Sequence, residues 1–110
     1  MSTMTGKEVR VVLCTCPADD AGRIARTILE ERLVACVNVV SGVKSLYWWK
    51  DQLTEDTESL LVIKTVATCY DALEKRLVEI HPYDTPEVLS VDVAAGNETY
   101  ISWVADSARC

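Results

Sequence analysis

The sequence lacks the features that mark membrane-spanning, exported and repetitive proteins. No apolar run is long enough to cross a bilayer, and the opening MSTMTGKEVR has no hydrophobic segment of the kind that a signal peptide needs. There is no glycine-rich tract, internal repeat or linker, and only four glycines and three prolines occur in 110 residues. These absences favour one globular domain over residues 1–110, with residues 1–7 as a flexible tail and the cytoplasm as its compartment.

Positive charge is also scarce. Lysine and arginine number 11 against 17 aspartates and glutamates, which gives a formal net charge of -6, and the basic residues are scattered. Nucleic acids and anionic membranes are held chiefly by clustered lysine and arginine. We therefore expect neither a nucleic acid nor a membrane as a partner.

Recognisable catalytic and zinc motifs are missing. The five cysteines, Cys14, Cys16, Cys36, Cys69 and Cys110, form no C-x-x-C pair, which excludes a zinc ribbon and a thioredoxin-like redox motif. The chain has no P-loop, no G-x-G-x-x-G and no readable Ser/His/Asp set, so we do not expect an enzyme. In a reducing compartment the cysteines are expected to be thiols, and Cys36 is expected to be buried in a strand.

Hydrophobic periodicity and turn residues predict alternating strands and helices. From Asp20 the apolar residues recur at helical spacing, whereas the segments on either side are rich in β-branched residues. Thr68 is the expected N-cap of a second helix, in a capping-box spacing with Asp71. The expected elements are strand 8–14, helix 20–32, strand 33–49 bent at Gly42, a polar hairpin tip 50–56, strand 58–66, helix 68–80 stopped by Pro82, strand 87–93 and a short helix capped by Asn97.

This order is β-α-β-β-α-β with one added helix, which is the order of a ferredoxin-like α+β domain. Right-handed crossovers place both main helices on one face of the sheet. The segments VVLC, LLVI and VLSV nevertheless carry apolar residues in both alternating sets, and Trp48 lies beside Trp49 next to the hairpin tip. We therefore expect a partner chain to cover the other face. The alternative is a monomer in which one tryptophan is core and the other lies at the surface.

Several motifs, in their order and spacing, are similar to those of the CutA family of divalent-cation tolerance proteins. They are VVLCTCPADD, LVACVNVV, SLYWW, VIKT, HPYDTPE and YISWV, and together they cover nearly the whole chain after Lys7. The resemblance implies a ferredoxin-like fold with an extended hairpin, assembled as a tight homotrimer similar to the nitrogen-regulatory PII signal proteins. It also implies a part in the response to metal ions, with no established reaction.

The resemblance further carries a copper-ligand role onto Cys14, at the end of the first strand, and onto His81. Either Glu87 or Cys16 would suit such a site as an added ligand, and we take Cys14, His81 and Glu87 as the expected metal ligands. Thiolate and imidazole donors favour copper over magnesium or calcium. A position that can be a second histidine in bacterial relatives is Ile80 here, so the number of donors is small.

Alternatives to metal binding stay open. In a ferredoxin-like sheet the first and fourth strands are antiparallel neighbours, so the loop with His81 and Glu87 is expected near Cys14 whether or not a metal binds. We interpret that loop either as one wall of a ligand-binding site or only as the turn that ends the helix. Lys64 is interpreted either as an anion-binding lysine of a subunit cleft or, as we favour, as a buried salt-bridge partner. The second function class is a PII-like signalling or scaffold module that binds a small anion or a partner protein.

Overall fold

The predicted α+β order is confirmed in the computed structural model, which describes residues 8–110. The predicted tail at residues 1–7 lies outside that range. The elements are β1 (Val9–Cys16), α1 (Ala18–Glu30), β2 (Cys36–Trp49), β3 (Gln52–Val66), the 3-10 turn η1 (Ala67–Cys69), α2 (Tyr70–Ile80), β4 (Leu89–Asp92) and α3 (Glu98–Ser107). Over residues 8–110 the strands form one antiparallel sheet in the order β2-β3-β1-β4.

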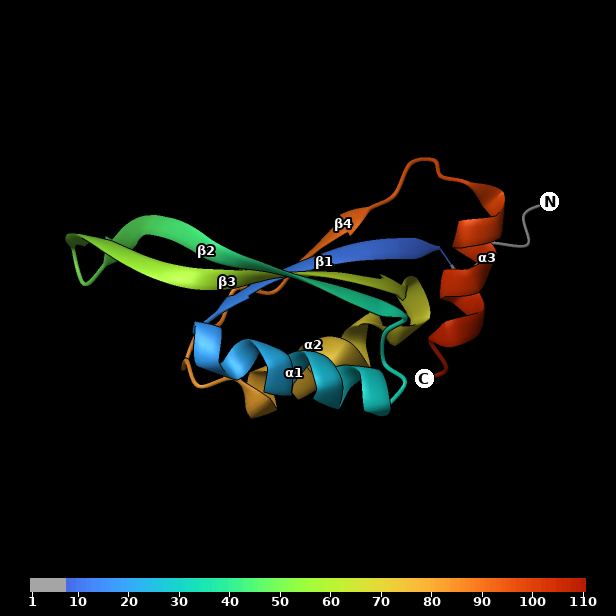
Figure 1. The fold of residues 1–110 in the computed structure, drawn as a ribbon, viewed down its shortest axis with the longest axis horizontal. Coiled ribbons are helices and arrows are strands. Elements are labelled where there is room, and N and C mark those ends of the chain that lie inside the picture. The colour runs from blue at the N-terminus through green and yellow to red at the C-terminus, as the bar shows by residue number, and fades with distance from the viewer. Residues whose placement is uncertain (1–7) are drawn as a thin grey trace.

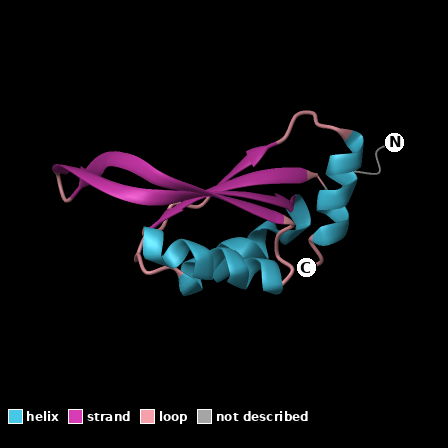
Figure 2. Cartoon of the chain, viewed as in Figure 1, coloured by secondary structure: helices cyan, strands magenta, loops and turns pink. Residues whose placement is uncertain are grey.

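Helices α1 and α2 form one layer against the sheet. Figure 1 shows α1 and α2 side by side on one face of the sheet and α3 across its end, and Figure 2 shows the same layering by element type. In α1 the buried residues Ala21, Ile24, Ala25 and Ile28 recur at helical spacing, which explains why this segment folds as a helix on the sheet. Helix α1 begins at Ala18, directly after Pro17, two residues before the predicted start.

The predicted capping box of the second helix is wrong. Residues Ala67–Cys69 form a 3-10 turn that runs directly into α2, and the N-cap residue is Cys69 with no side-chain cap hydrogen bond. The 3-10 turn supplies a backbone acceptor, since the N–H of Tyr70 donates to the carbonyl of Ala67, so no side-chain cap is needed there. The predicted cap of α3 is confirmed, because Asn97 Oδ1 accepts the N–H of Tyr100 across 2.9 Å.

Two apolar clusters hold the layers together. The larger lies between the sheet and α1 with α2, and the smaller lies beneath α3. The fully buried members of the larger cluster include Val12, Cys14, Ile24, Ile28, Leu61, Ile63, Leu73 and Leu77. The smaller cluster contains Val9, Val66, Cys69, Val104 and Ala108. Burial of this kind contributes about 25 cal/mol for each Å² of apolar surface removed from water.

The other face of the sheet is open in the single chain. Leu89 and Val91 of β4 pair with Leu13 and Val11 of β1 and are 57% and 49% exposed. Because successive side chains of a strand point to opposite faces of the sheet, this face carries the side chains that do not contact α1 and α2. An open apolar face of this kind is what the two-sided strand pattern predicted. That a partner chain covers it stays a prediction.

A long hairpin extends from the sheet, where β2 pairs with β3 from Cys36↔Lys64 to Trp49↔Gln52. The predicted bend is confirmed as a β-bulge between Val40 and Val43, with Gly42 at φ 71°. The predicted polar tip 50–56 is wrong, because the turn consists of Lys50 and Asp51, at φ 49° and 61°, and the ladder continues through the remaining polar residues.

Three side-chain predictions are also wrong. Cys69 and Cys110 form a disulfide and are not thiols. Cys36 is only half-buried, because β2 is an edge strand with one open side. Lys64 forms no salt bridge among the described residues; its Nζ donates to Asn38 Oδ1, which lies on the neighbouring strand β2.

Candidate functional site

The predicted metal ligands come from three segments that the fold brings to one end of the sheet. Cys14 lies on β1 with its side chain fully buried, His81 is the C-cap residue of α2, and Glu87 lies in the loop that precedes β4. The pairing of Leu13 with Leu89 places that loop beside the end of β1, as the antiparallel arrangement of these strands predicted. Proximity of Cys14 to this loop is therefore a property of the topology.

His81 is held by protein groups through both ring nitrogens. Its Nδ1 accepts the backbone N–H of Tyr83 across 3.1 Å, so the ring proton belongs on Nε2, which lies 2.8 Å from the carbonyl oxygen of Thr15. His81 is 7% exposed and its ring centroid lies 4.8 Å from that of Tyr83. The imidazole therefore ties the end of α2 to the end of β1 and has no free lone pair.

Tyr83 extends this hydrogen-bond network to the buried side chain of Glu58. Its hydroxyl donates to Glu58 Oε2 across 2.8 Å, and Glu58 is 6% exposed. Burial, followed by the hydrogen bond to Glu58, raises the pKa of Tyr83 above its ordinary value of 10.0. Tyr83 therefore stays a neutral donor at neutral pH, and the chain from Thr15 through His81 to Glu58 links β1, the loop after α2 and β3.

The Cys14 thiol is protonated at neutral pH. Burial first, and then the charges of Cys16, Glu87 and Glu58, raise its pKa from 9.0 to about 12. The thiolate is the nucleophile and the metal ligand, so a thiol with this pKa is a poor nucleophile, and a metal ion must displace its proton.

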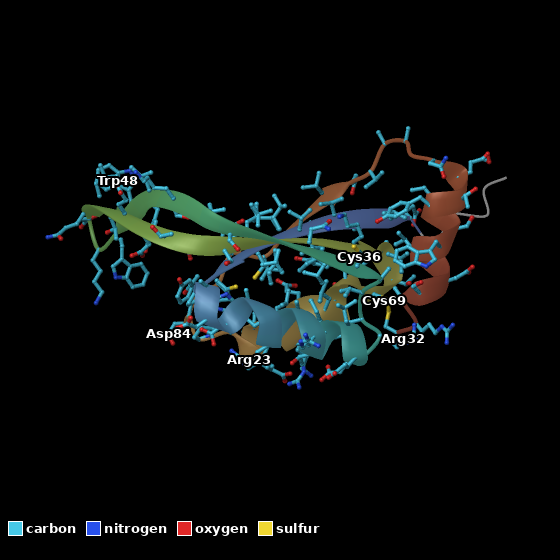
Figure 3. The ribbon with its side chains drawn as sticks, viewed as in Figure 1. Arg23, Arg32, Cys36, Trp48, Cys69 and Asp84 are labelled. Carbon is cyan, nitrogen blue, oxygen red and sulfur yellow. A yellow bond between two sulfur atoms is a disulfide. The ribbon has the colours of Figure 1, made fainter. Side chains whose placement is uncertain are left out.

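A groove opens between the hairpin and the loop 83–87. Its volume is about 790 Å³, and its walls come from the hairpin arms, the end of β1 and that loop. Figure 3 shows the two labelled residues of this region, Trp48 on the hairpin and Asp84 on the loop, at the same end of the molecule. The groove carries the carboxylates of Asp56, Glu58, Asp84 and Glu87, the aromatic rings of Tyr47, Trp48, Trp49 and Tyr83, and the ammonium of Lys44. Acidic groups outnumber basic ones, so the groove attracts cations and repels anions.

The three predicted ligands do not form a ready metal shell. Over residues 8–110, no three His, Cys, Asp or Glu side chains are arranged to hold a metal ion. The buried Cys14 thiol and the doubly bonded His81 ring give the physical reason, because each must change its present state before it can ligate. Metal ligation by Cys14, His81 and Glu87 stays a prediction.

Sequence reasoning missed the acidic residues of the hairpin. Glu58 and Asp56 lie on β3 where its polar and apolar segments meet, and Tyr47 on β2 donates its hydroxyl to Asp56 Oδ2. Tyr47 pairs with Thr54, so Asp56 is its diagonal cross-strand neighbour. A hairpin register fixed from the sequence would have revealed this pair. The contact between Glu58 and Tyr83 joins residues far apart in the chain, and no local pattern indicates it.

Comparison with known proteins relates this chain to one family. Residues 10–107 match the family model described as CutA1 divalent ion tolerance protein. The chain is 41% identical over 98 residues to the divalent-cation tolerance protein CutA of Thermus thermophilus, which covers 88% of this chain and 95% of that protein. It is 42% identical over 109 residues to the chloroplastic protein CutA 1 of Oryza sativa, which covers 98% of this chain but only 62% of that protein.

Solved structures give the same relation. The crystal structure of CutA1 from Oryza sativa superposes with a TM-score of 0.91 at 40% identity, over 96% of this chain and 97% of that one. The PII-like protein CutA from Nostoc, in apo form, superposes with a TM-score of 0.87 at 33% identity, over 91% of this chain and 97% of that one. Among the helices of residues 8–110, none is long and apolar enough to cross a membrane.

Proposed function

This chain belongs to the CutA1 divalent ion tolerance protein family, and we propose that it acts there as a homotrimer that binds a divalent cation, copper above others, in the groove beneath its hairpin. The observation that carries this proposal is the charge of the groove, which has four carboxylates against one ammonium. Excess negative charge in a cleft raises the local concentration of cations. The proposed role is binding rather than catalysis, and the proposed compartment is the cytoplasm.

The proposed trimer is supported by the apolar surface of the single chain. Trp48 and Trp49 are 73% and 53% exposed near the tip of a hairpin that makes the molecule 49 Å long, and Leu89 and Val91 are exposed on the open face of the sheet. Contiguous exposed apolar surface marks interaction sites, and edge strands are prone to pair with another chain. Contact of the hairpin with a neighbouring copy would make the groove a cleft between subunits.

Of the three proposed ligands, Glu87 lines the groove, whereas Cys14 and His81 are buried beside its lining residues Thr15 and Tyr83. Because Nε2 of His81 carries the proton, a metal ion would take the lone pair of Nδ1, and the N–H of Tyr83 would lose its acceptor. Cys14 would lose its proton in the same step. Both changes cost free energy, so we expect copper to bind weakly, and more tightly as the pH rises.

The test is an anaerobic competition titration with Cu²⁺, and with Zn²⁺ in parallel, using chelators that buffer the free ion. We expect Cys14→Ala and Glu87→Gln to weaken copper binding by about tenfold or more, or about 1.4 kcal/mol each. The matched controls are Cys16→Ala, which removes the other buried thiol of β1, and Glu74→Gln, which removes an exposed carboxylate of α2 outside the groove. If all four variants bind copper as the wild type does, the proposed ligands are wrong.

A second candidate is a PII-like module that binds a small molecule between subunits. The similarity to the PII-like CutA of Nostoc favours it, as does a groove far larger than a single ion needs. The acidic lining disfavours the small anion considered from the sequence and favours an organic cation, which the aromatic rings would also attract. Calorimetric titration with tetramethylammonium and with sulfate distinguishes an organic-cation site from an anion site, because we expect heat of binding only with the cation.

A further inference from the structure

A disulfide lies at the end of the molecule opposite the groove. It joins Cys69, at the start of α2, to Cys110, which follows α3, with 5.5 Å between the two Cα atoms and a sequence separation of 41. Figure 3 shows Cys69 and Arg32 together beside α3, at the other end of the molecule from Asp84. The bond therefore lies apart from the residues proposed to bind a cation.

Hydrogen bonds hold the same segment against the end of α1. The N–H of Arg109 donates to the carbonyl of Arg32 across 2.9 Å, and Arg32 Nη1 donates to the carbonyl of Ser107 across 3.3 Å. Arg32 follows Glu31, the C-cap residue of α1, and adopts φ 61°. Ala108 is 2% exposed in the apolar cluster beneath α3. Apart from its continuity with α3, the segment 107–110 is attached to the rest of the domain by one disulfide, the two hydrogen bonds to Arg32 and the buried methyl group of Ala108.

The two cysteine residues differ in their exposure to solvent. Cys69 is 1% exposed and packs with Val9, Val66 and Val104, whereas Cys110 is exposed. Thiol–disulfide exchange requires a thiolate to approach one sulfur directly, so a thiol from solution reaches Cys110 first. When the bond is broken, Cys69 remains as a small buried hydrophobe in a filled cluster. Cys69, Val9 and Val104 can therefore stay packed without the bond, whereas Ala108 belongs to the segment that the bond holds.

We propose that Cys110 is a site of reversible thiolation by small-molecule thiols, and that the Cys69–Cys110 bond is a redox latch on the segment 107–110. A thiolate attacks Cys110 Sγ, forms a mixed disulfide there, and expels Cys69 as a thiolate that takes up a proton. A second thiolate attacks the outer sulfur of the mixed disulfide, which releases the small-molecule disulfide and leaves Cys110 as a thiol. In total two thiols are oxidised, and the protein disulfide gains two electrons and two protons.

Opening the latch frees the segment without unfolding the domain. The hydrogen bonds to Arg32 remain available, but exposed hydrogen bonds of this kind hold a segment only weakly. We expect the amide of Arg109 to exchange with solvent at least about tenfold faster in the reduced protein than in the oxidised protein. This latch is independent of cation binding in the groove.

The experiment places the full chain, purified without reductant, in a series of reduced and oxidised glutathione buffers. Mass spectrometry of the intact protein and of its non-reduced peptides gives the fraction in each state and the cysteine that carries glutathione. Hydrogen exchange of the peptide that contains residues 107–110 gives the conformational readout. Cys110→Ser removes the exposed partner and Cys36→Ser is the matched control, because Cys36 lies outside the pair.

We expect a Cys69–Cys110 crosslink that opens and closes reversibly in native buffer, a mixed disulfide on Cys110, and fast exchange of the segment on reduction. Cys110→Ser should show the fast exchange in every buffer, and Cys36→Ser should follow the wild type. Absence of the crosslink in every buffer would overturn the proposal, as would a crosslink that opens only in denaturant. A mixed disulfide on Cys69 would also contradict it, because the direction of attack would then be wrong.

Discussion

His81 lies with its Nε2 2.8 Å from the carbonyl oxygen of Thr15, while its Nδ1 accepts the N–H of Tyr83. One side chain thus connects α2, β1 and the loop that leads to β4. The ring is placed by the end of α2, which stops before Pro82. The loop that follows this helix stop lines the groove with Tyr83 and Glu87. Whether it binds a ligand there stays a prediction.

We expect His81→Ala to reduce the free energy of unfolding by about 1 to 3 kcal/mol, because it leaves a part-buried carbonyl and a part-buried N–H without partners. His81→Gln is the matched variant, since its side-chain amide can donate to Thr15 again. Urea denaturation should show partial recovery in His81→Gln. Equal losses in the two variants would mean that ring packing, rather than the hydrogen bond to Thr15, is what matters.

The buried Cys14 thiol predicts a loss of stability in alkali. In the folded protein its pKa is raised to about 12 from an ordinary 9.0, so the unfolded chain releases this proton at lower pH than the folded chain does. The contribution of Cys14 is therefore fully present below about pH 9 and is lost as the pH rises toward 12, at up to about 1.4 kcal/mol per pH unit.

Urea denaturation at pH 8 and pH 10 tests this dependence. We expect Cys14→Ala to lose some stability at the lower pH through a small cavity, but to lose less than the wild type between the two values. Burial also raises the pKa of Cys16 above its ordinary 9.0, which acts in the same direction, so the slope of the variant should be reduced and not abolished. Parallel profiles for the two proteins would show that Cys14 ionises normally.

Gly42 and Gly22 form a matched pair for backbone effects. Gly42 sits in the bulge of β2 at φ 71°, Gly22 lies within α1, and a Cβ at either position would meet no atom within 4 Å. We expect Gly42→Ala to destabilise the fold by about 1 to 2 kcal/mol, because an alanine is strained in the left-handed region. Gly22→Ala should stabilise it by about 0.5 to 1 kcal/mol. Thermal or urea denaturation that gives the same sign for both would refute the assignment of the bulge.

Much of the fold was predictable because it depends on local spacing. The apolar stripe of α1 and the Asn97 cap of α3 are set within a few residues, and the proximity of β1 and β4 follows from the order of the elements. The turn at Lys50 and Asp51 was missed because neither residue is the glycine or asparagine that usually marks positive φ. The polar residues that follow it resemble a loop in sequence, although they pair as a strand.

The candidate site was less predictable because its contacts join distant segments. His81 contacts the carbonyl of Thr15, and Glu58 accepts from Tyr83, across separations that no periodicity records. The chemical state of Cys14 was likewise hidden, because the pKa of a thiol depends on burial and on the charges around it. The sequence identified several residues of the site. It did not show which of their lone pairs and protons already take part in hydrogen bonds within the chain.

The exposed tryptophans predict the consequence of blocking assembly. We expect the wild type to sediment as a trimer at micromolar concentration, and its midpoint of unfolding to rise with protein concentration. Replacing Trp48 and Trp49 with glutamate should shift the protein to smaller species and remove that dependence, because charge at the centre of an apolar interface is costly.

The control for this prediction is Val78→Glu. Val78 is 50% exposed, similar to Trp49, but it lies on α2 in the helical layer, away from the hairpin and the open face of the sheet. Sedimentation velocity should therefore show a trimer for Val78→Glu and smaller species for the tryptophan variant. If the wild type sediments as a stable monomer, or if both variants dissociate to the same extent, the hairpin and the open face are not the surfaces that join the subunits.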